Sequence, residues 1–438
     1  MTSRVPRAAE AILLCIAPAF AATITVPTDF PLIQDAIGYA ADGDSVLILP
    51  GTYLQNFSFE GKGITVTGSD PSDWAVVENT VIDAEGNRSV VGFRDWEQRS
   101  SVLAGLTLTG GTGSIYDVGP MGGKSVAGGG IFCDRWTRPV IRSCLVSGNE
   151  AIGETAYGGG VFCHEHSSPL LVDTRIENNE SVDRGGGVGA RSASPLMLRC
   201  SVADNVALIY GGGGYFADPA TNFRAAILRC EIDRNQAIAG GGLCVVGRTL
   251  VIVNSEIRDN VALSDSGALS FTGDGRALLY GTLIDGNNAE RDGGAISCTS
   301  SGTMYAENCT IINNTAGDDG SAIMAYHSSY PVLRNTILWG NGPDPLFVGG
   351  DASITATYCN IEGGWPGDGN IDSDPLFADR YHGFEHLLST DSPCIDSGDP
   401  AILDAIYDTD PRWPGGHVDG PRSDMGMYSG IGNGLWLR

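Results

Sequence analysis

A glycine-rich unit recurs at a nearly constant interval through the middle of the chain. Its copies read GGGIFC, GGGVFC, GGGVGA, GGGYFA, GGGLCV, SGALSF, GGAISC and GSAIMA between Gly128 and Ala325. The first apolar residues of successive copies are 26 to 30 residues apart, at Ile131, Val161, Val188, Tyr215, Leu243, Leu269, Ile296 and Ile323. A period in this range predicts a solenoid, because one unit cannot cover its own apolar face and stacking of neighbours supplies the core.

A second signature in each unit indicates the kind of solenoid. It ends in a column of asparagines, Asn149, Asn179, Asn205, Asn235, Asn260, Asn287, Asn314 and Asn341. An aliphatic residue stands three positions before each of them, and short β-branched runs between Gly, Asn and Ser are typical of strands joined by turns. Strands that repeat with one polarity pair in parallel, about 4.8 Å apart. The sequence therefore predicts an all-β parallel β-helix.

Leucine-rich repeats are the alternative fold, because they share a similar spacing of small, aliphatic and Asn residues. They also require more Leu and a helix or short 3₁₀ turn in each repeat. Each unit here has a second strand signal and a glycine cluster in that place. The β-helix is therefore favoured.

Stacking places equivalent residues of successive coils above one another, which gives the cysteines a structural interpretation. One predicted column holds Cys144, Cys200, Cys230, Cys309 and Cys359 with Thr174, Ser255, Thr282 and Thr336. A second holds Cys133, Cys163 and Cys298 with Ala190, Ala217 and Ala325. Exchange with Ala, Ser and Thr indicates packing in a tight space rather than ligation or obligatory pairing. The Asn column is interpreted as a ladder of side-chain amides that bind turn backbone and the next coil.

The run Cys163, His164, Glu165, His166 contains residue types that bind transition metals. In the predicted coil Cys163 is a buried wall residue, and the three residues after it begin a turn on the outside. A structural metal at this spot is therefore disfavoured.

The N-terminus predicts export. Arg4 and Arg7 precede an apolar run that ends near Ala22, and Ala19 and Ala21 form a small-x-small cleavage pattern. Residues 1–21 are thus predicted to be a signal peptide, and the run is too short for a membrane span. We expect a secreted, periplasmic or cell-surface monomer.

The formal charge of -26 at pH 7 limits the partners. Nucleic acid and anionic membranes would repel such a chain, whereas bound cations are compatible with it.

Several phrases resemble one family. VPTDFPLIQDAIGYAADGDSVLILPGTY, GLTLTGG, CTIINNTA, ILWGN and SPCIDSGDP are similar to exported bacterial right-handed parallel β-helix repeat proteins of the pectate-lyase-like superfold, as found in planctomycetes. The resemblance implies a right-handed helix over most of the chain, but no single activity.

The two ends of the solenoid need caps. A short amphipathic helix over 31–41, preceded by Thr28 and Asp29, is predicted to close the N-terminal end. The expected division is a signal peptide (1–21), the N-terminal cap and first coil (22–60), the β-helix (61–364) and an irregular C-terminal cap and tail (365–438).

Catalytic motifs of the superfold are missing from the sequence. The pectin methylesterase pattern GxYxE would need Glu where Gln55 follows Gly51 and Tyr53. The polygalacturonase set and the Asp-Pro-His-Asp motif of alginate epimerases are also missing. A lyase that uses Arg or Lys with Ca²⁺ has no diagnostic short motif, so whether the protein is an enzyme stays open.

Candidate binding residues cluster in the turn that follows the GGGIFC-type strand of the early coils. They are Arg135, Trp136, Arg138, His164, Glu165, His166 and Arg191, and Arg248, Arg276 and His327 continue the row in later coils. Inserts at 112–126 and 150–157 are predicted to form a wall beside them. An aromatic ring for sugar stacking and Arg or His for carboxylates suit an acidic polysaccharide.

No cofactor is indicated with certainty, but the C-terminal cap contains candidate Ca²⁺ ligands, Asp396, Asp399, Asp408 and Asp410. Three functions remain open. The favoured one is non-catalytic binding of polysaccharide or cell-surface glycan. The alternatives are a polysaccharide lyase or glycoside hydrolase that acts on an acidic polysaccharide, and a purely structural envelope protein.

Overall fold

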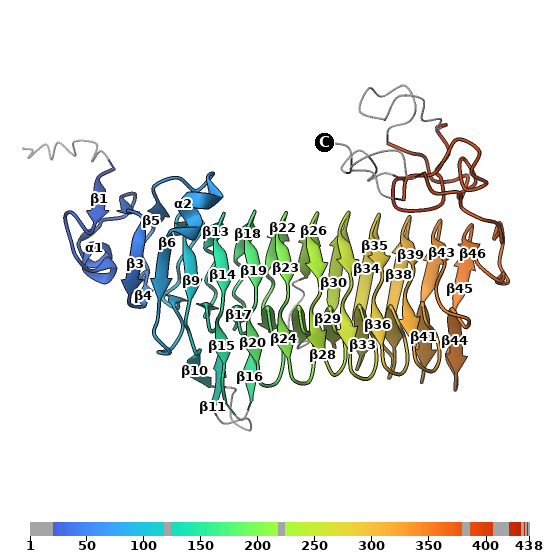
Figure 1. The fold of residues 1–438 in the computed structure, drawn as a ribbon, viewed down its shortest axis with the longest axis horizontal. Helices are drawn as coiled ribbons and strands as arrows, with labels where there is room; N and C mark the ends of the chain where they lie inside the picture. The colour runs from blue at the N-terminus through green and yellow to red at the C-terminus, as the bar shows by residue number, and fades with distance from the viewer. Residues whose placement is uncertain are drawn as a thin grey trace, which may run out of the picture.

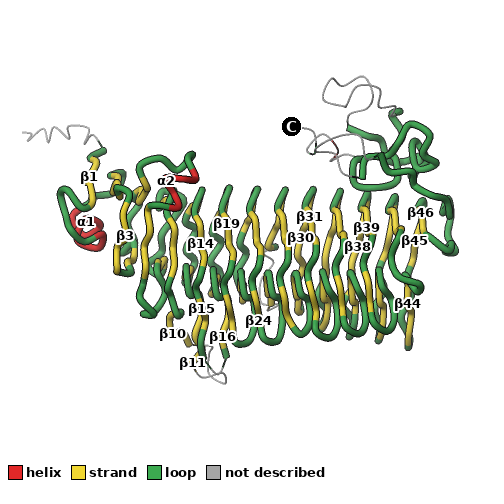
Figure 2. Tube along the Cα trace, viewed as in Figure 1, coloured by secondary structure: helices red, strands yellow, loops and turns green. Residues whose placement is uncertain are grey.

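The computed structural model describes residues 21–117, 124–153, 155–217, 224–378, 386–405 and 420–430, together with Asn433 and Trp436. Over these residues the chain winds into a long parallel β-helix (Figure 1). Within this part of the chain the only helices are α1 (Ile33–Tyr39) and α2 (Trp74–Glu78), both near the N-terminal end (Figure 2). Neither has the length and apolarity needed to cross a bilayer. The predicted all-β solenoid is confirmed, and the leucine-rich alternative is wrong because the described residues of the repeats from Gly128 to Ala325 contain no helix.

Three long parallel sheets form the walls of the tube. Sheet A contains β1 (Thr23–Val26), β2 (Ser45–Ile48), β5 (Thr65–Gly68), β8 (Val102–Ala104), β13 (Val140–Arg142), β18 (Leu170–Val172), β22 (Leu196–Leu198), β26 (Ala225–Leu228), β30 (Thr249–Val253), β34 (Arg276–Tyr280), β38 (Thr303–Glu307), β42 (Val332–Arg334) and β45 (Thr355–Thr357). Sheet B contains β3 (Gly51–Leu54), β6 (Thr80–Asp83), β9 (Thr107–Thr109), β14 (Leu145–Ser147), β19 (Arg175–Glu177), β23 (Ser201–Ala203), β27 (Glu231–Asp233), β31 (Glu256–Arg258), β35 (Leu283–Asp285), β39 (Thr310–Ile312), β43 (Ile337–Trp339) and β46 (Asn360–Ile361).

Sheet C carries the glycine-rich units and precedes sheet A in each coil. It contains β4 (Phe57–Ser58), β7 (Val91–Phe93), β12 (Ile131–Cys133), β17 (Val161–His164), β21 (Val188–Arg191), β25 (Gly214–Ala217), β29 (Leu243–Val246), β33 (Leu269–Thr272), β37 (Ile296–Cys298), β41 (Ile323–Tyr326) and β44 (Leu346–Gly349).

Two smaller sheets complete the fold. Sheet E is a row of two-residue strands after the Asn column, namely β15 (Glu150–Ala151), β20 (Glu180–Ser181), β24 (Val206–Ala207), β28 (Gln236–Ala237), β32 (Val261–Ala262), β36 (Asn288–Ala289) and β40 (Thr315–Ala316). Sheet D is built from the inserts and contains β10 (Ser114–Asp117), β11 (Lys124–Ala127) and β16 (Ala156–Tyr157).

The Asn column forms the predicted ladder. Asn179 Nδ2 donates to Asn205 Oδ1 at 3.0 Å and to the carbonyl oxygen of Val146 at 2.9 Å, and the backbone N–H of Asn179 reaches the same Oδ1 at 3.0 Å. Equivalent bonds continue through Asn235, Asn260 and the coils beyond. These side chains are buried, so the ladder satisfies backbone groups that the bend would otherwise leave unpaired.

The first cysteine column also lies where it was predicted, at the bend between sheets A and B. Each hydroxyl or thiol donates to the carbonyl oxygen two residues earlier, for example Cys144 to Arg142 at 3.4 Å and Thr174 to Val172 at 3.0 Å. The ten cysteines in the described residues are free and buried. Burial raises the pKa of Cys144 to about 11 and that of Cys309 to about 12, so these thiols stay protonated and unreactive at neutral pH.

The second cysteine column requires one correction. Cys133 pairs with Cys163, and Cys163 with Ala190, as expected. In the next coil Phe216 takes the position assigned to Ala217, and Ala217 pairs with Arg191 instead. The reason is the run of four glycines before Tyr215, because Gly214 already occupies the first position of the strand.

Helix α1 covers the N-terminal end of the core and buries Ile33, Ala36 and Ile37. It is shorter than predicted, and Asp29 does not cap it but accepts the N–H of Thr25. Gln55 Oε1 accepts the N–H of Ile33 at 2.9 Å. The residue that breaks the esterase pattern thus has a structural role at the start of α1.

The segment after β46 closes the other end of the tube and then folds back. Trp365 packs against the core, and Asn370 Nδ2 donates to the carbonyl oxygen of Ala356. Later residues lie along the side of the last coils rather than over their end (Figure 1). There Asn308 Nδ2 donates to the Ser423 and Ser429 hydroxyls.

Candidate functional site

The candidate residues lie on the turns from sheet C to sheet A. Backbone hydrogen bonds hold these turns in register, from Trp136 N–H to Glu165 O at 2.9 Å and from His166 N–H to Ser192 O at 2.7 Å. The turn of the preceding coil is held in the same register, because the N–H of Asp134 donates to the carbonyl oxygen of Phe93 at 2.9 Å. Side chains that are far apart in sequence therefore form columns across adjacent coils.

One of these columns consists of aromatic rings. Trp96, Trp136 and His166 occupy the same turn position in three consecutive coils, each three residues after the last core residue of its sheet C strand. Their φ angles are 68°, 63° and 63°. Trp96 is 62% exposed and Trp136 is 37% exposed. We call Trp96, Trp136 and His166 the aromatic column.

Sequence reasoning missed Trp96. The signal was present, because GFRDW at 92–96 and FCDRW at 132–136 place Trp at the same distance from the strand. The first coils lack the GGG marker, so the repeat pattern alone does not align Trp96 with Trp136.

The rings of Trp136 and His166 lie against each other, with centroids 4.2 Å apart and planes inclined at 32°. Cys163 faces the core and is fully buried. The four residues from Cys163 to His166 therefore lie in three different environments. Cys163 lies in the core, His166 belongs to the aromatic column, and His164 and Glu165 belong to a third group. The four side chains therefore do not converge on a single metal centre.

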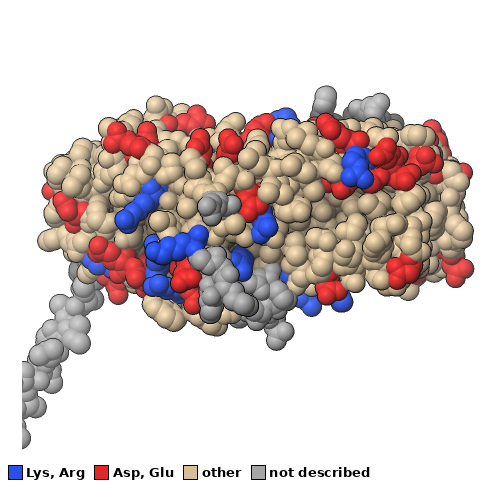
Figure 3. Space-filling view, turned by 90° about the horizontal axis from the view of Figure 1, so that it is seen from below, with Lys and Arg blue, Asp and Glu red and all other residues tan. Residues whose placement is uncertain are grey.

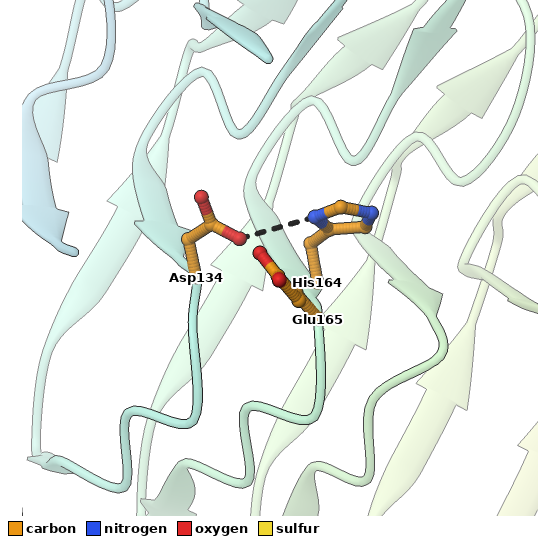
Figure 4. A group of neighbouring side chains, drawn as sticks. All are labelled: Asp134, His164 and Glu165. Atoms are coloured by element: carbon orange, nitrogen blue, oxygen red, sulfur yellow. Dashed lines mark hydrogen bonds and ion pairs between the residues drawn. The ribbon is translucent and has the colours of Figure 1, made fainter. Parts of the chain in front are cut away.

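The third group joins His164 and Glu165 to Asp134 of the preceding coil (Figure 4). His164 Nδ1 lies 3.0 Å from Asp134 Oδ1, and one potential ligand atom from each of the three residues lies within 4.8 Å of the others. The Asp134 side chain is 5% exposed and that of His164 is 16% exposed, whereas Glu165 is exposed. Among the described residues this is the one group of three or more His, Cys, Asp or Glu side chains close enough to share a metal ion.

Sheet D stands beside this group, as predicted for the inserts, although 118–123 and Glu154 lie outside the described residues. Tyr116 of β10 packs its ring 4.8 Å from that of His164 and 5.0 Å from that of Phe162. Burial raises the pKa of Tyr116, and the nearby Arg191 partly opposes this. Tyr116 therefore stays protonated and forms an apolar wall against His164.

Arginines flank the aromatic column. Arg135 is exposed, and its Nε lies 3.8 Å from Asp134 Oδ2. Arg138 is exposed as well, and Arg99 donates to the carbonyl oxygens of Arg138 and Pro139 at 3.1 and 2.9 Å. Burial and the charge of Arg138 lower the pKa of Arg99. Viewed from below, the solenoid carries its Lys and Arg mainly in the N-terminal half of that face (Figure 3).

The predicted continuation of the row into later coils is partly wrong. Arg248 is buried and contributes no exposed charge. His327 and Arg276 are exposed, and the His327 ring lies 4.0 Å from that of Tyr326. In the turns that the structure describes, the dense combination of rings and guanidinium groups therefore lies in the first coils.

The predicted Ca²⁺ ligands are not gathered into one site. Arg334 binds Asp399, with Nε 3.0 Å from Oδ2, so a guanidinium group occupies the place expected for a metal. The N–H of Ala401 and the Arg334 guanidinium lower the pKa of Asp399. Within the described part of the cap no Lys or Arg pairs with Asp396, and its backbone N–H donates to Asp424. Asp408 and Asp410 lie outside the described residues.

Comparison with known families identifies the class of fold. The model of the right-handed β-helix region matches residues 219–373, about a third of the chain. With the parallel strand order this defines a right-handed parallel β-helix. A search of curated protein sequences gave no match.

Solved structures of the same architecture have low sequence identity to the chain. The A-module of mannuronan C-5 epimerase AlgE6 from Azotobacter vinelandii is 14% identical, with a TM-score of 0.44, over 78% of this chain and 93% of that one. Pectate lyase Pel9A is 13% identical, with a TM-score of 0.38, over 90% of each chain. The pectin methylesterase of Aspergillus niger is 12% identical, with a TM-score of 0.30, over 82% of this chain and 88% of that one. At these values the similarities do not bear on activity.

Proposed function

We propose that the protein is exported and binds acidic polysaccharide, without cleaving it, at the aromatic column and its flanking arginines. The observation that carries this proposal is the column itself. Three bulky rings occupy left-handed backbone positions that Gly, Asn or Asp adopt more readily.

The backbone conformation has a cost. A residue with a Cβ in the left-handed region costs roughly 1–2 kcal/mol, and the equivalent turns of later coils use Asp274, Ser301 and Ser328. An aromatic ring at this position adds no core packing when it is 62% exposed, as Trp96 is. Strain of this kind is typical of functional sites, where it is offset by the rest of the fold.

The geometry suits a chain of sugars. Adjacent coils repeat at about 4.8 Å, so the column is an extended platform rather than a single pocket. Exposed rings offer flat apolar surfaces to the C–H faces of pyranose units. Arg99, Arg135 and Arg138 supply guanidinium groups that can pair with carboxylates in a bidentate manner.

The arrangement favours binding over cleavage. The charged side chains proposed from the sequence do not converge on one point, because His166 stacks on Trp136 while His164 and Glu165 turn toward Asp134. The esterase, polygalacturonase and epimerase motifs of the superfold are missing from the sequence, whereas a lyase has no short motif by which to judge it.

Removing both tryptophans tests the proposal. We expect Trp96→Gly combined with Trp136→Gly to weaken binding of oligogalacturonate or oligoalginate by at least tenfold, measured by isothermal titration calorimetry, which corresponds to about 1.4 kcal/mol. The unfolding midpoint should not fall, because glycine relieves the left-handed strain.

Tyr39→Ala is the matched control, since it removes a ring that is 73% exposed on α1. Affinity that survives in the double variant, or is lost equally in the control, would contradict the proposal. A rise in ultraviolet absorbance from unsaturated products during the incubation would instead identify a lyase.

A further inference from the structure

We propose that Asp134, His164 and Glu165 form a binding site for a first-row divalent transition metal ion such as Zn²⁺. The inference does not rest on the proposed polysaccharide binding. It spans two coils, which explains why no contiguous motif in the sequence reveals it.

The fold places the ligands. Because Cys133 pairs with Cys163 in parallel register, Asp134 and His164 are the next residues of two adjacent strands and point the same way. Two donors bound tetrahedrally to one Zn²⁺ at about 2.0–2.2 Å lie roughly 3.3–3.5 Å apart. The distance of 3.0 Å from His164 Nδ1 to Asp134 Oδ1 is close to this. Glu165 is exposed and in the same turn as His164, so its carboxylate can adjust to complete the set.

The charges in this group favour a cation. Asp134 and Glu165 bring two carboxylates together, and the carboxylate of Asp134 is almost fully buried. Burying a carboxylate is costly unless an opposite charge is near. Arg94, which follows Phe93 in the same column, is directed elsewhere, with its guanidinium 5.0 Å from the centroid of the Phe132 ring. Arg135 contacts both carboxylate oxygens of Asp134: its Nε lies 3.8 Å from Oδ2, and its backbone N–H donates to Oδ1 at 3.0 Å. The Arg135 side chain is 57% exposed, so water screens this ion pair and leaves the buried carboxylate only weakly neutralised.

The donor set selects the kind of metal. One imidazole and two carboxylates suit Zn²⁺ and similar ions, whereas Ca²⁺ and Mg²⁺ prefer oxygen ligands alone. Cys163 faces the core and His166 stacks on Trp136, so neither completes the site. Three protein ligands leave a coordination position open for water or another ligand.

Metal titration of the tag-free protein tests the inference. We expect calorimetry to show one Zn²⁺ bound per chain, and Co²⁺ to give visible absorption bands of a low-coordinate N/O site. The variants His164→Gln and Glu165→Gln should each weaken binding at least tenfold, because loss of even an outer-shell partner costs about 10–100-fold. Both readouts are independent of any enzymatic activity.

His166→Gln is the matched control, because it removes an imidazole from the same turn without touching the group. It should keep the wild-type affinity and the Co²⁺ spectrum. Glu165 is exposed, so Glu165→Gln remains informative even if His164→Gln folds poorly. Failure of the wild type to bind either ion at tens of micromolar, or unchanged binding in folded Glu165→Gln, would overturn the inference. Loss of binding in His166→Gln alone would overturn it as well.

Discussion

Replacing Ile232 by Asp is expected to unfold the middle of the solenoid. Ile232 is fully buried and stacks in the core between Val202 and Ile257 of the adjacent coils. An Asp there would place an unpaired carboxylate in an apolar wall, and such changes cost about 4 kcal/mol or more. Each coil is stabilised mainly by its neighbours, so the damage spreads to both sides.

Urea denaturation and hydrogen exchange measure the effect of Ile232→Asp. We expect a large fall in the unfolding midpoint and early exchange in the coils around 200–260. Gln236→Asp is the control, because it adds the same charge at an exposed position of the same coil. Equal stability of the two variants would show that Ile232 does not face a dry core.

Replacing Asn235 by Ala should give the second large effect, a loss of roughly 3 kcal/mol or more in the free energy of unfolding. The Asn235 side chain accepts from the N–H and Nδ2 of Asn205 at 3.0 Å each. It donates to Val202 O and to Asn260 Oδ1 at 2.9 Å each. Removing it leaves several buried polar groups unpaired, each at a cost of about 1–3 kcal/mol.

Asn288→Ala is the control for the Asn column. Asn288 is the next residue after a ladder asparagine, but it is exposed and bonds only to the Thr315 hydroxyl in the next coil. Its loss should change the free energy of unfolding by no more than about 0.5 kcal/mol. If chemical denaturation shows equal effects for both variants, the ladder does not stabilise the coils as described.

The repetitive part of the fold could be predicted because its coils are nearly equal in length. Equivalent positions therefore recur at a constant interval in the sequence, which makes the period, the β-branched positions and the Asn column visible. The prediction went wrong at Ala217, where one extra glycine shifted the strand register. It also could not foresee that the chain after β46 returns along the side of the tube, since the bonds of Asn308 to Ser423 and Ser429 join distant residues without a repeat.

The candidate site was predicted only in outline. The turn with Trp136, His164 and His166 was found from residue types, but the partners of each side chain depend on the coil above or below. Asp134 is 30 residues from His164, and Trp96 lies in an irregular coil without the glycine marker. The register between adjacent coils therefore determines which side chains are neighbours on this surface. The sequence alone predicts that register only where the repeats are regular.

Oxidative footprinting of the tryptophans tests the central claim most directly. Hydroxyl radicals and mass spectrometry would measure the oxidation rates of Trp96 and Trp136 with and without oligogalacturonate, with Tyr39 and Trp74 as references. Binding at the aromatic column predicts slower oxidation of Trp96 and Trp136 only. Saturating ligand that leaves both rates unchanged, or protects Trp74 instead, would contradict the account.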